Sequence, residues 1–509
     1  MARPPVHANI LIIRGSPPLP LHARMLPLVM KFRFLLLSFL AACSASADQI
    51  LTLKNSAGKE IKVELVKLED DLALLRRSDG KEFRTPLSLL APESRDLVSS
   101  TWKNQLAKLG NSMEPLNKAL GLPLFAGPGS LWDEQISEVA ARLKWPVESK
   151  TPFTSSYRLY TRPNYLVAGA HPYTVVAYGD EKGRTESFSL IFSNKGDSLS
   201  TAGSGEDHFT SSGEKIDRST LEGAMLYDEK VISSALSKVL GQGTTQRFAG
   251  QGSGTIEVTR WDWNGHAFLL AHVEEEYVSL QIVKTSFADD NGKTDFIKDG
   301  DMRIRLEANV TTEKNGDVII KNIPMVDQGP KGYCAPATFE RAMRHAGVSA
   351  DMYLLATLAT TAGGGTNTTK LYDEVAFTTR SKGGRTARKI DLKSLAPRKI
   401  EKYIEKGVPI LWQMCSLPLY NTIANDRTKE RKNVKDWGAY SIKIAEEAKQ
   451  NASQLTARGN YHICMIIGYN ELTNELAVSD SWGQNYKIRW VHLDEAEAVS
   501  MESGFVIDL

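Results

Sequence analysis

Cys334 is the residue of this 509-residue sequence that is best suited to nucleophilic chemistry. It ends a loop rich in glycine and proline, and the apolar pattern over Pro336–Ala346 predicts a helix that Gly347 ends. Unpaired N–H groups and the dipole at a helix N-terminus stabilise negative charge, so we expect this thiol to ionise readily. A thiolate is the nucleophile that acyl transfer requires.

Two downstream residues could assist that thiolate. His462 opens the apolar run Tyr461–Tyr469, and Asp480 directly follows the run Leu476–Ser479. A turn between the two runs predicts a β-hairpin, which would bring both side chains to the same end of a sheet. His462 could then take the thiol proton while Asp480 orients the imidazole ring. The histidine lies 128 residues and the aspartate 146 residues after the cysteine, and papain-type enzymes show separations of roughly 130–150 residues.

Two sequence blocks around these residues match a known family. Asp327-Gln328-Gly329 places a glutamine six residues before the cysteine, and Asp480-Ser481-Trp482-Gly483 carries the third residue of the set. On these residues, the region from Ile323 to Leu509 resembles papain-fold cysteine peptidases, specifically the branch related to bacteriocin-processing (double-glycine leader) peptidases. Papain has Asn at the third position, and Asp480 follows the bacteriocin-related branch.

The resemblance implies a papain-like α+β domain over residues 321–509 that hydrolyses peptide bonds in a peptide or protein substrate. Cys334 would form an acyl-enzyme, with His462 as the base and Asp480 as the residue that orients it. Gln328 would donate its side-chain amide to the oxyanion hole, beside the backbone N–H of the cysteine.

Other functions stay open on the same residues. The related bacteriocin peptidases are usually fused to a transporter with membrane helices and an ATPase, and this chain shows neither, so cleavage of double-glycine leaders is not expected. A catalytically silent surface protein could use the papain-like domain as a binding platform. An acyltransferase could use the same residues with an amine as the acceptor. The region ahead of the peptidase could also restrain it, as pro-segments do.

The first 47 residues are predicted to be an export signal, with Met30 or, as the alternative, Met25 as the true start of translation. A short basic segment precedes the apolar run Phe34–Ala42, and Ala45-Ser46-Ala47 suits cleavage by a signal peptidase. Leu40-Ala41-Ala42-Cys43 also looks like a bacterial lipobox, which would leave a lipid anchor on Cys43. Both interpretations imply export to the periplasm, the cell surface or the medium, and we favour plain cleavage.

Two further modules are expected between the signal and the peptidase. Residues 48–101 show short strand-like runs separated by glycine turns, which predict a small, bent β-barrel. They resemble the SH3-like Sla homology domain of yeast and of secreted bacterial proteins, which implies a binding or spacer module that could take a protein ligand. Residues 102–320 predict an α+β domain of no recognised family, with a helix over Ser219–Leu240 and a loop over Gly241–Gly254. Its strand-like runs are Tyr173–Tyr178, Ser187–Phe192, Gly254–Trp263, Ala267–Val273 and Tyr277–Val283.

Composition excludes several classes of protein. An apolar share of 42% can form buried cores, which excludes wholesale disorder. The longest apolar run, Phe34 to Cys43, is shorter than the roughly 20 residues that span a bilayer. A net charge of +2 argues against a dedicated nucleic-acid binder, and four cysteines are too few for a disulfide scaffold.

Three other patterns could suggest a bound ion or phosphate, and each has a plainer explanation. His272 and Glu274–Glu276 fit alternating strand positions and an acidic hairpin end. Asp289–Gly292 lacks the ligand spacing of a calcium loop, and Gly363–Thr366 lacks the spacing of a phosphate loop. We therefore expect no metal ion and no cofactor.

The remaining expectations concern the surroundings of the site. Trp482 is expected to pack over the aspartate, and His345 to be exposed at the far end of the cysteine's helix. The polar, lysine-rich segment Leu417–Asn451 is interpreted as an insertion beside the cleft. Cys415 and Cys464 are expected in the core, with a disulfide between them left open.

Overall fold

The computed structural model describes residues 50–69, 71–198, 220–250, 252, 254–293, 296–329, 332–359 and 366–509. The expected start at Met30, the cleavage site Ala45–Ala47 and the lipid-anchor candidate Cys43 lie outside the described residues, as does the glycine run at 363–365. The chain divides into two compact units, residues 1–98 and 99–509, which are described separately below. Among the helices in the described part of the chain, none is long and apolar enough to cross a membrane.

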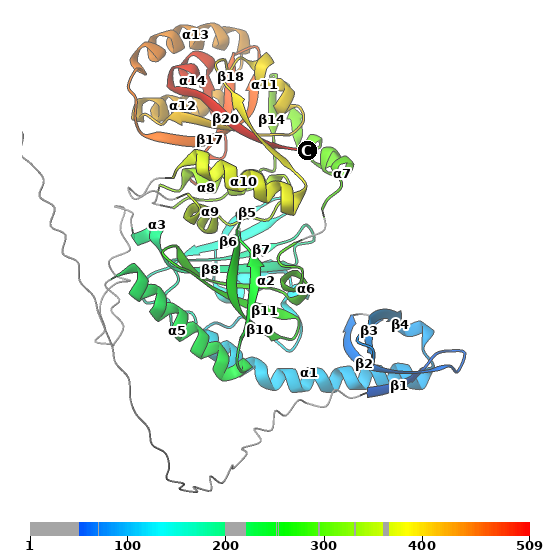
Figure 1. The fold of residues 1–509 in the computed structure, drawn as a ribbon. Coiled ribbons are helices and arrows are strands. Elements are labelled where there is room, and N and C mark those ends of the chain that lie inside the picture. Colours follow the sequence, from blue (N-terminus) through cyan, green and yellow to red (C-terminus); the bar gives the residue numbers. More distant parts are fainter. Residues whose placement is uncertain are drawn as a thin grey trace, which may run out of the picture. The chain divides into compact units, whose positions relative to one another are not determined.

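The first unit contains a four-stranded antiparallel meander in the order β1-β2-β3-β4 (Figure 1). Its strands are β1 (Ile50–Lys54), β2 (Glu60–Glu69), β3 (Leu72–Arg77) and β4 (Glu82–Pro86), followed by the short helix η1 (Leu87–Leu89). Alternate apolar residues such as Leu53, Val63 and Leu75 are buried, as the period of two along a strand requires. The expected short strands are confirmed, whereas the likeness to an SH3-type domain stays a prediction. Helix α1 (Pro92–Leu120) begins here and continues into the second unit.

The second unit opens with an eight-stranded antiparallel sheet, called the middle sheet below, in the order β5-β6-β7-β8-β12-β11-β10-β9. Its strands are β5 (Val147–Lys150), β6 (Ser155–Tyr160), β7 (Thr174–Gly179), β8 (Thr185–Asn194), β9 (Thr244–Ala249), β10 (Thr255–Trp263), β11 (His266–Val273) and β12 (Tyr277–Lys284). The five predicted strands and the helix over Ser219–Leu240, observed as α5 (Leu221–Leu240), are confirmed.

One prediction for this region is wrong. The expected loop over Gly241–Gly254 contains β9, which pairs with β10 at the edge of the middle sheet. Four of the six residues of β9 are polar, so this edge strand lacks the apolar alternation that reveals a strand in a sequence.

The C-terminal sheet follows the order β13-β14-β17-β16-β20-β15, and β18 pairs with β17 and β19. Its strands are β13 (Val310–Thr312), β14 (Asp317–Ile320), β15 (Thr386–Asp391), β16 (Ile410–Cys415), β17 (Tyr461–Asn470), β18 (Glu475–Ser479), β19 (Arg489–His492) and β20 (Ser500–Asp508). The sheet therefore starts at Val310, ahead of the boundary expected at residue 321. Mixed helix and sheet content agrees with the α+β class expected for this region.

Helices connect and cover the two sheets of the second unit. They are η2 (Leu131–Asp133), α2 (Ile136–Leu143), α3 (Lys195–Ser198), α6 (Thr285–Asp289), α7 (Asp299–Glu307), α8 (Cys334–His345), α9 (Met352–Thr357), α10 (Thr368–Gly383), α11 (Pro397–Ile404), α12 (Pro418–Arg431), α13 (Trp437–Gln454), η3 (Gln484–Tyr486) and α14 (Leu493–Val499). The segment interpreted as an insertion thus forms α12 and α13, and α12 packs on β19.

Both faces of the middle sheet are buried, as β11 illustrates. Phe268 and Leu270 point into a core formed with α2 and α5, whereas Leu269 points to the opposite face. That second face shares a hydrophobic core with α8 and α9, through residues such as Ala337 and Tyr353. Figure 1 shows α8 and α9 between the middle sheet and the C-terminal sheet. The cysteine's helix is therefore an inner layer, packed against a sheet on each side.

Candidate active site

Cys334 is the first residue of α8, as its sequence predicts. The helix begins where the backbone N–H of Ala337 donates to the carbonyl of Tyr333. Pro336 lies in this first turn, where the missing N–H of proline leaves no bond unmade. The thiol is half-buried, and its sulfur accepts hydrogen bonds from the backbone N–H groups of Ala335 and Ile463. These donors and the helix N-terminus favour a negative sulfur.

The hairpin of β17 and β18 brings His462 and Asp480 together. The strands are antiparallel, and Met465 pairs with Ser479, so both residues lie at the open end of the hairpin. The imidazole Nε2 of His462 lies 2.9 Å from Oδ1 of Asp480, and both side chains are buried. The side chain of His462 also hydrogen-bonds the thiol of Cys334, for which its other ring nitrogen remains available. Three residues that are remote in the sequence therefore form one hydrogen-bonded chain.

The electrostatics of this chain favour a thiolate and an imidazolium. Burial raises the pKa of Cys334, but the hydrogen bond and charge of His462, together with the backbone N–H groups of Ile463 and Ala335, lower it overall. Burial lowers the pKa of His462, but Asp480 and Cys334 raise it to about 9. Burial likewise raises the pKa of Asp480, yet His462 and Arg489 bring it below its usual value. Each partner thus stabilises the charged form of its neighbour.

Arg489 is a member of the site that the sequence analysis did not identify. From β19 it donates two hydrogen bonds to Oδ2 of Asp480, from Nε at 2.9 Å and from Nη2 at 2.6 Å. Its Nη1 also donates to Oδ1 of Asn421 in α12. A sequence signal did exist, because an arginine directly before the apolar residues Trp490 and Val491 of a short strand needs a partner once that strand is buried. The pairing itself depends on how β18 and β19 are registered.

Trp482 contacts the histidine of the site. Its ring stacks on the imidazole of His462, with centroids 4.9 Å apart and planes 29° apart, whereas its expected packing over the aspartate stays a prediction. The two carboxylate oxygens of Asp480 are already occupied by His462 and Arg489. The indole therefore covers the face of the ring whose nitrogens serve the thiol and the carboxylate.

Gln328 lies in the segment Met325–Gly329, called the oxyanion loop below. Its backbone N–H donates to the carbonyl of Ser481 at 2.8 Å, which ties this loop to the residue that follows Asp480. Pro330 and Lys331, between this loop and the cysteine, lie outside the described residues. The structure thus brings the glutamine's backbone to the block that carries the third residue.

Two polar residues of α8 clamp the cysteine's helix to the hairpin, and neither was identified from the sequence. The Oγ1 of Thr338 donates to the carbonyl of Ile463, next to His462. Arg341 is fully buried, and donates to the carbonyl of Pro324 at 2.9 Å and to Oγ of Ser479 at 2.5 Å. Burial lowers the pKa of Arg341 to about 10. A helix fixed in this way holds its first residue in place.

His462, Cys464 and Asp480 together could offer three ligand atoms to a metal ion, since these atoms lie within 4.8 Å of one another. The arrangement suits a hydrogen-bonded site better. Burial raises the pKa of Cys464 well above its usual value, so the thiol stays protonated, and the charge of Arg489 beside the carboxylate opposes a cation. The other two residues already bond to each other.

The cysteines Cys334, Cys415 and Cys464 are free, so the disulfide left open is not formed. The strand register pairs Cys415 with Tyr461 and Cys464 with Trp412, which keeps the two thiols apart. Both cysteines belong to the hydrophobic core, as expected.

His345 is buried, contrary to expectation. Its Nε2 lies 2.9 Å from the carbonyl of Gly407, and burial lowers its pKa to about 4. The error arose because α8 is covered on both sides, which its own sequence does not reveal. Elsewhere, Nδ1 of His272 lies 2.6 Å from Oε2 of Glu229, a pairing that accounts for this histidine without a metal ion.

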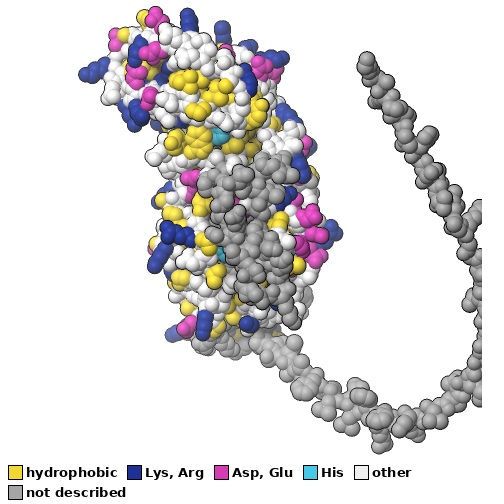
Figure 2. Space-filling model, turned by 90° about the vertical axis from the view of Figure 1, so that its left-hand side faces the viewer, with side chains coloured by type: hydrophobic (Ala, Val, Ile, Leu, Met, Phe, Trp, Pro, Cys, Tyr) yellow, Lys and Arg dark blue, Asp and Glu magenta, His cyan; other side chains and the backbone are white. Residues whose placement is uncertain are grey.

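Apolar side chains are exposed next to the site. Tyr461, which directly precedes His462, is 68% exposed, and Leu419 of α12 is 39% exposed. Figure 2 shows hydrophobic side chains gathered on the upper part of the face that it draws. A surface of this kind can contact apolar side chains of a bound peptide.

A family model described as the Peptidase C39 like family matches residues 320–501. The matched segment contains all four residues of the predicted site. No curated protein matches the chain. The C-terminal region is therefore similar to C39-like cysteine peptidases, in agreement with the resemblance seen in its sequence.

Proposed function

We propose that the C-terminal region is an active cysteine peptidase that cleaves peptide bonds through an acyl-enzyme on Cys334. The observation that carries this proposal is the hydrogen-bonded chain from Cys334 through His462 to Asp480, whose pKa shifts favour the thiolate. The family match over residues 320–501 supports the same class of enzyme.

The proposed reaction has two steps. The thiolate of Cys334 attacks the carbonyl carbon of the peptide bond, and the resulting oxyanion receives hydrogen bonds from the Gln328 side chain and the Cys334 N–H. His462 then gives its proton to the leaving amine as the C–N bond breaks. In the second step His462 takes a proton from water, the hydroxide attacks the thioester, and the acid product leaves as the thiolate is restored. Asp480 keeps the imidazole oriented in both steps.

The test compares wild type with Cys334→Ala and with Cys415→Ala, a matched control in which a buried core thiol is removed. Each protein is incubated with a mixture of synthetic peptides, and new termini are identified by mass spectrometry. We expect cleavage by wild type and the control, and none by Cys334→Ala. Identical product lists for all three proteins would contradict the proposal. Addition of glycinamide separates hydrolysis from acyl transfer, because a transferase would form amides with it.

We also propose export, supported by the apolar run Phe34–Ala42 and the small residues that follow it. The intact mass of protein purified from a bacterial host decides between the two forms. A terminus after Ala47 supports plain cleavage, and a diacylated Cys43 supports a lipoprotein. An uncleaved leader contradicts export.

A further inference from the structure

We propose that the middle sheet is part of the catalytic apparatus: Glu148 and Tyr160 position the oxyanion loop and thereby Gln328. This inference rests on the proposed peptidase function. Both residues belong to strands more than 160 residues ahead of the loop, and no feature of their own sequence connects them with the site.

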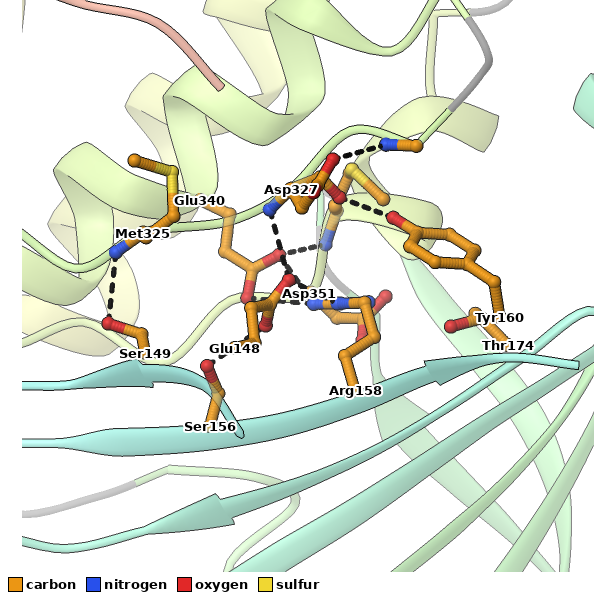
Figure 3. Close-up of polar contacts among 12 residues, drawn as sticks. Glu148, Ser149, Ser156, Arg158, Tyr160, Thr174, Met325, Asp327, Glu340 and Asp351 are labelled. Atoms are coloured by element: carbon orange, nitrogen blue, oxygen red, sulfur yellow. Dashed lines mark hydrogen bonds and ion pairs between the residues drawn. The ribbon is translucent and has the colours of Figure 1, made fainter. Parts of the chain in front are cut away.

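Hydrogen bonds from the middle sheet hold both the backbone N–H and the backbone carbonyl of Asp327, the residue before Gln328 (Figure 3). Oε1 of Glu148 accepts a hydrogen bond from the N–H of Asp327 at 3.1 Å. The hydroxyl of Tyr160 donates to the carbonyl of Asp327. Because the N–H of Gln328 donates to Ser481, the peptide group that joins Asp327 to Gln328 is held at its oxygen and at its nitrogen.

The loop is also held at its start and its end. Oγ of Ser149 accepts from the N–H of Met325 at 3.0 Å. Gly329 has a φ of +67°, and a Cβ at this position would lie 3.1 Å from Cζ of the Tyr160 ring. The tyrosine ring therefore packs directly on the backbone of the loop, at a place where a larger residue would push it away.

Glu148 is itself fixed by buried partners. Nε of Arg158 donates to its Oε1 at 2.8 Å, and Oγ of Ser156 donates to its Oε2 at 2.9 Å. The side chains of Glu148 and Arg158 are only 3% and 1% exposed. Nε2 of Gln484, just beyond the Asp480 block, donates to the backbone carbonyl of Glu148 at 2.9 Å. A rigid strand thus contacts both the oxyanion loop and the turn after β18.

The same network reaches the cysteine's helix. Arg158 Nη2 lies 3.2 Å from Oε2 of Glu340 in α8. Tyr178 of β7 donates to Oε1 of Glu340 at 2.9 Å, and the N–H of Met352 donates to Oε2 at 2.6 Å. Glu340 is fully buried and accepts hydrogen bonds from donors in three other elements, β6, β7 and α9. The middle sheet therefore sets the position of α8 relative to the oxyanion loop.

The physical consequence concerns one step of the reaction. A hydrogen-bond donor stabilises an oxyanion only if it is already in place when the charge develops. A loop is held less firmly than a strand, so donors on loops need support from rigid elements. None of the contacts described involves the thiol of Cys334. Weakening them should impair stabilisation of the oxyanion and leave the ionisation of the thiol unchanged.

Two reagents separate these effects without knowledge of the natural substrate. With 4-nitrophenyl acetate the thiolate attacks the acyl carbon, an oxyanion forms, and 4-nitrophenolate leaves with the electron pair of the broken C–O bond. With iodoacetamide the thiolate displaces iodide and no oxyanion arises. The first rate depends on the thiolate and on the oxyanion hole, whereas the second depends on the thiolate alone.

The decisive variant is Tyr160→Phe, which removes only the hydroxyl. Tyr165→Phe is the matched control, because its hydroxyl accepts from Trp145 Nε1 at 2.9 Å, remote from the oxyanion loop. We expect Tyr160→Phe to slow acylation by about 10-fold. This effect is smaller than the roughly 100-fold or greater loss of rate that follows removal of an oxyanion donor itself, because the glutamine is still present and is only less well positioned. Alkylation should stay within about twofold of wild type, because the thiolate is unchanged. The control should change neither rate.

Two results would overturn the inference. Acylation of Tyr160→Phe at the wild-type rate would show that the hydroxyl does not position the loop. An equal fall of acylation and alkylation would indicate general damage to the site. Failure of the proposed function gives a different result, in which wild type is acylated no faster than Cys334→Ala.

Discussion

Arg489 binds the oxygen of Asp480 that His462 leaves free, through two hydrogen bonds of 2.9 Å and 2.6 Å. This fork explains why a carboxylate stands where papain has an amide. A guanidinium offers only donors, so the atom that meets its Nε and Nη2 groups must be an acceptor, as Oδ2 of Asp480 is. An asparagine would direct its NH2 group either at Arg489 or at His462. Either orientation is unfavourable, because a guanidinium and an imidazolium offer only N–H donors, so two donors would face each other.

This pairing predicts the behaviour of three variants. Asp480→Asn should slow acylation by 4-nitrophenyl acetate at least about 10-fold, because the imidazole loses its orientation. Arg489→Met should lower the free energy of unfolding by about 1–3 kcal/mol, since a buried carboxylate oxygen loses its donors. In urea unfolding, the double variant should lose less free energy of unfolding than the two single variants lose together, because it no longer contains an unpaired guanidinium.

Urea unfolding and acylation rates measure these effects. The control is Arg388→Met, whose partner Asp508 is also an aspartate but whose own side chain is 52% exposed. An exposed pair contributes little, so this variant should change stability by less than about 0.5 kcal/mol. Strict additivity of Asp480→Asn and Arg489→Met would show that the two residues are not coupled.

The dependence of alkylation on pH tests the thiolate–imidazolium pair. Because the pKa of Cys334 is lowered, wild type should react with iodoacetamide at pH values below the ordinary pKa of a cysteine thiol, and lose reactivity as the pH falls through that lowered pKa. His462→Ala removes the main cause of lowering and leaves burial, which raises the pKa. Its alkylation at pH 7 should therefore be at least about 10-fold slower than that of wild type. Equal profiles would mean that His462 does not activate the thiol.

Peptide cleavage should also fall at high pH, for a different reason. The pKa of His462 is raised to about 9, so above that value the imidazole has no proton for the leaving amine. Alkylation needs no such proton and should not fall there. A comparison of the two rates between pH 8 and 10 separates the roles of the two residues, and parallel curves would contradict the assignment.

The stacking of Trp482 on His462 predicts a graded response to substitution. Trp482→Ala removes the surface against which the imidazole rests, a contact worth about 0.5–1.5 kcal/mol, so cleavage should slow about 3- to 10-fold. Trp482→Phe keeps an aromatic face and should recover most of the rate. Both variants are measured for peptide cleavage and thermal unfolding. A slow Phe variant with an active Ala variant would exclude stacking as the cause.

The shared core between the middle sheet and α8 predicts that the C-terminal region does not fold alone. Residues 308–509 start before β13 and so keep the whole C-terminal sheet, but they leave the apolar side of α8 and α9 in water. We expect this fragment to lack a cooperative unfolding transition, whereas residues 92–509, which start at α1, should unfold cooperatively.

Circular dichroism during urea unfolding checks this prediction, and the rate of acylation accompanies it. A folded fragment that is more active than the longer chain would support the alternative in which the region ahead of the peptidase restrains it. An inactive, unfolded fragment agrees with a middle sheet that is a structural layer of the site.

Much of the site could be predicted from local patterns. The helix that starts at Cys334 and the hairpin of β17 and β18 follow from apolar periodicity and turn residues within a few positions of one another. The strand β9 was missed because four of its six residues are polar, and His345 was misplaced because both sides of α8 are covered. A periodic pattern shows which face is apolar and does not show how many layers cover it.

The sequence by itself predicted that Cys334, His462 and Asp480 form one candidate site, and it indicated a C39-like cysteine peptidase, because these inferences depend on residue types and on local elements. Only the tertiary structure decided that Arg489 completes the carboxylate, that Trp482 covers the imidazole, and that Glu148 and Tyr160 hold the oxyanion loop. The last two contacts join segments more than 160 residues apart in the sequence. Such contacts depend on which buried faces of two sheets meet, and packing over the whole chain decides that pairing.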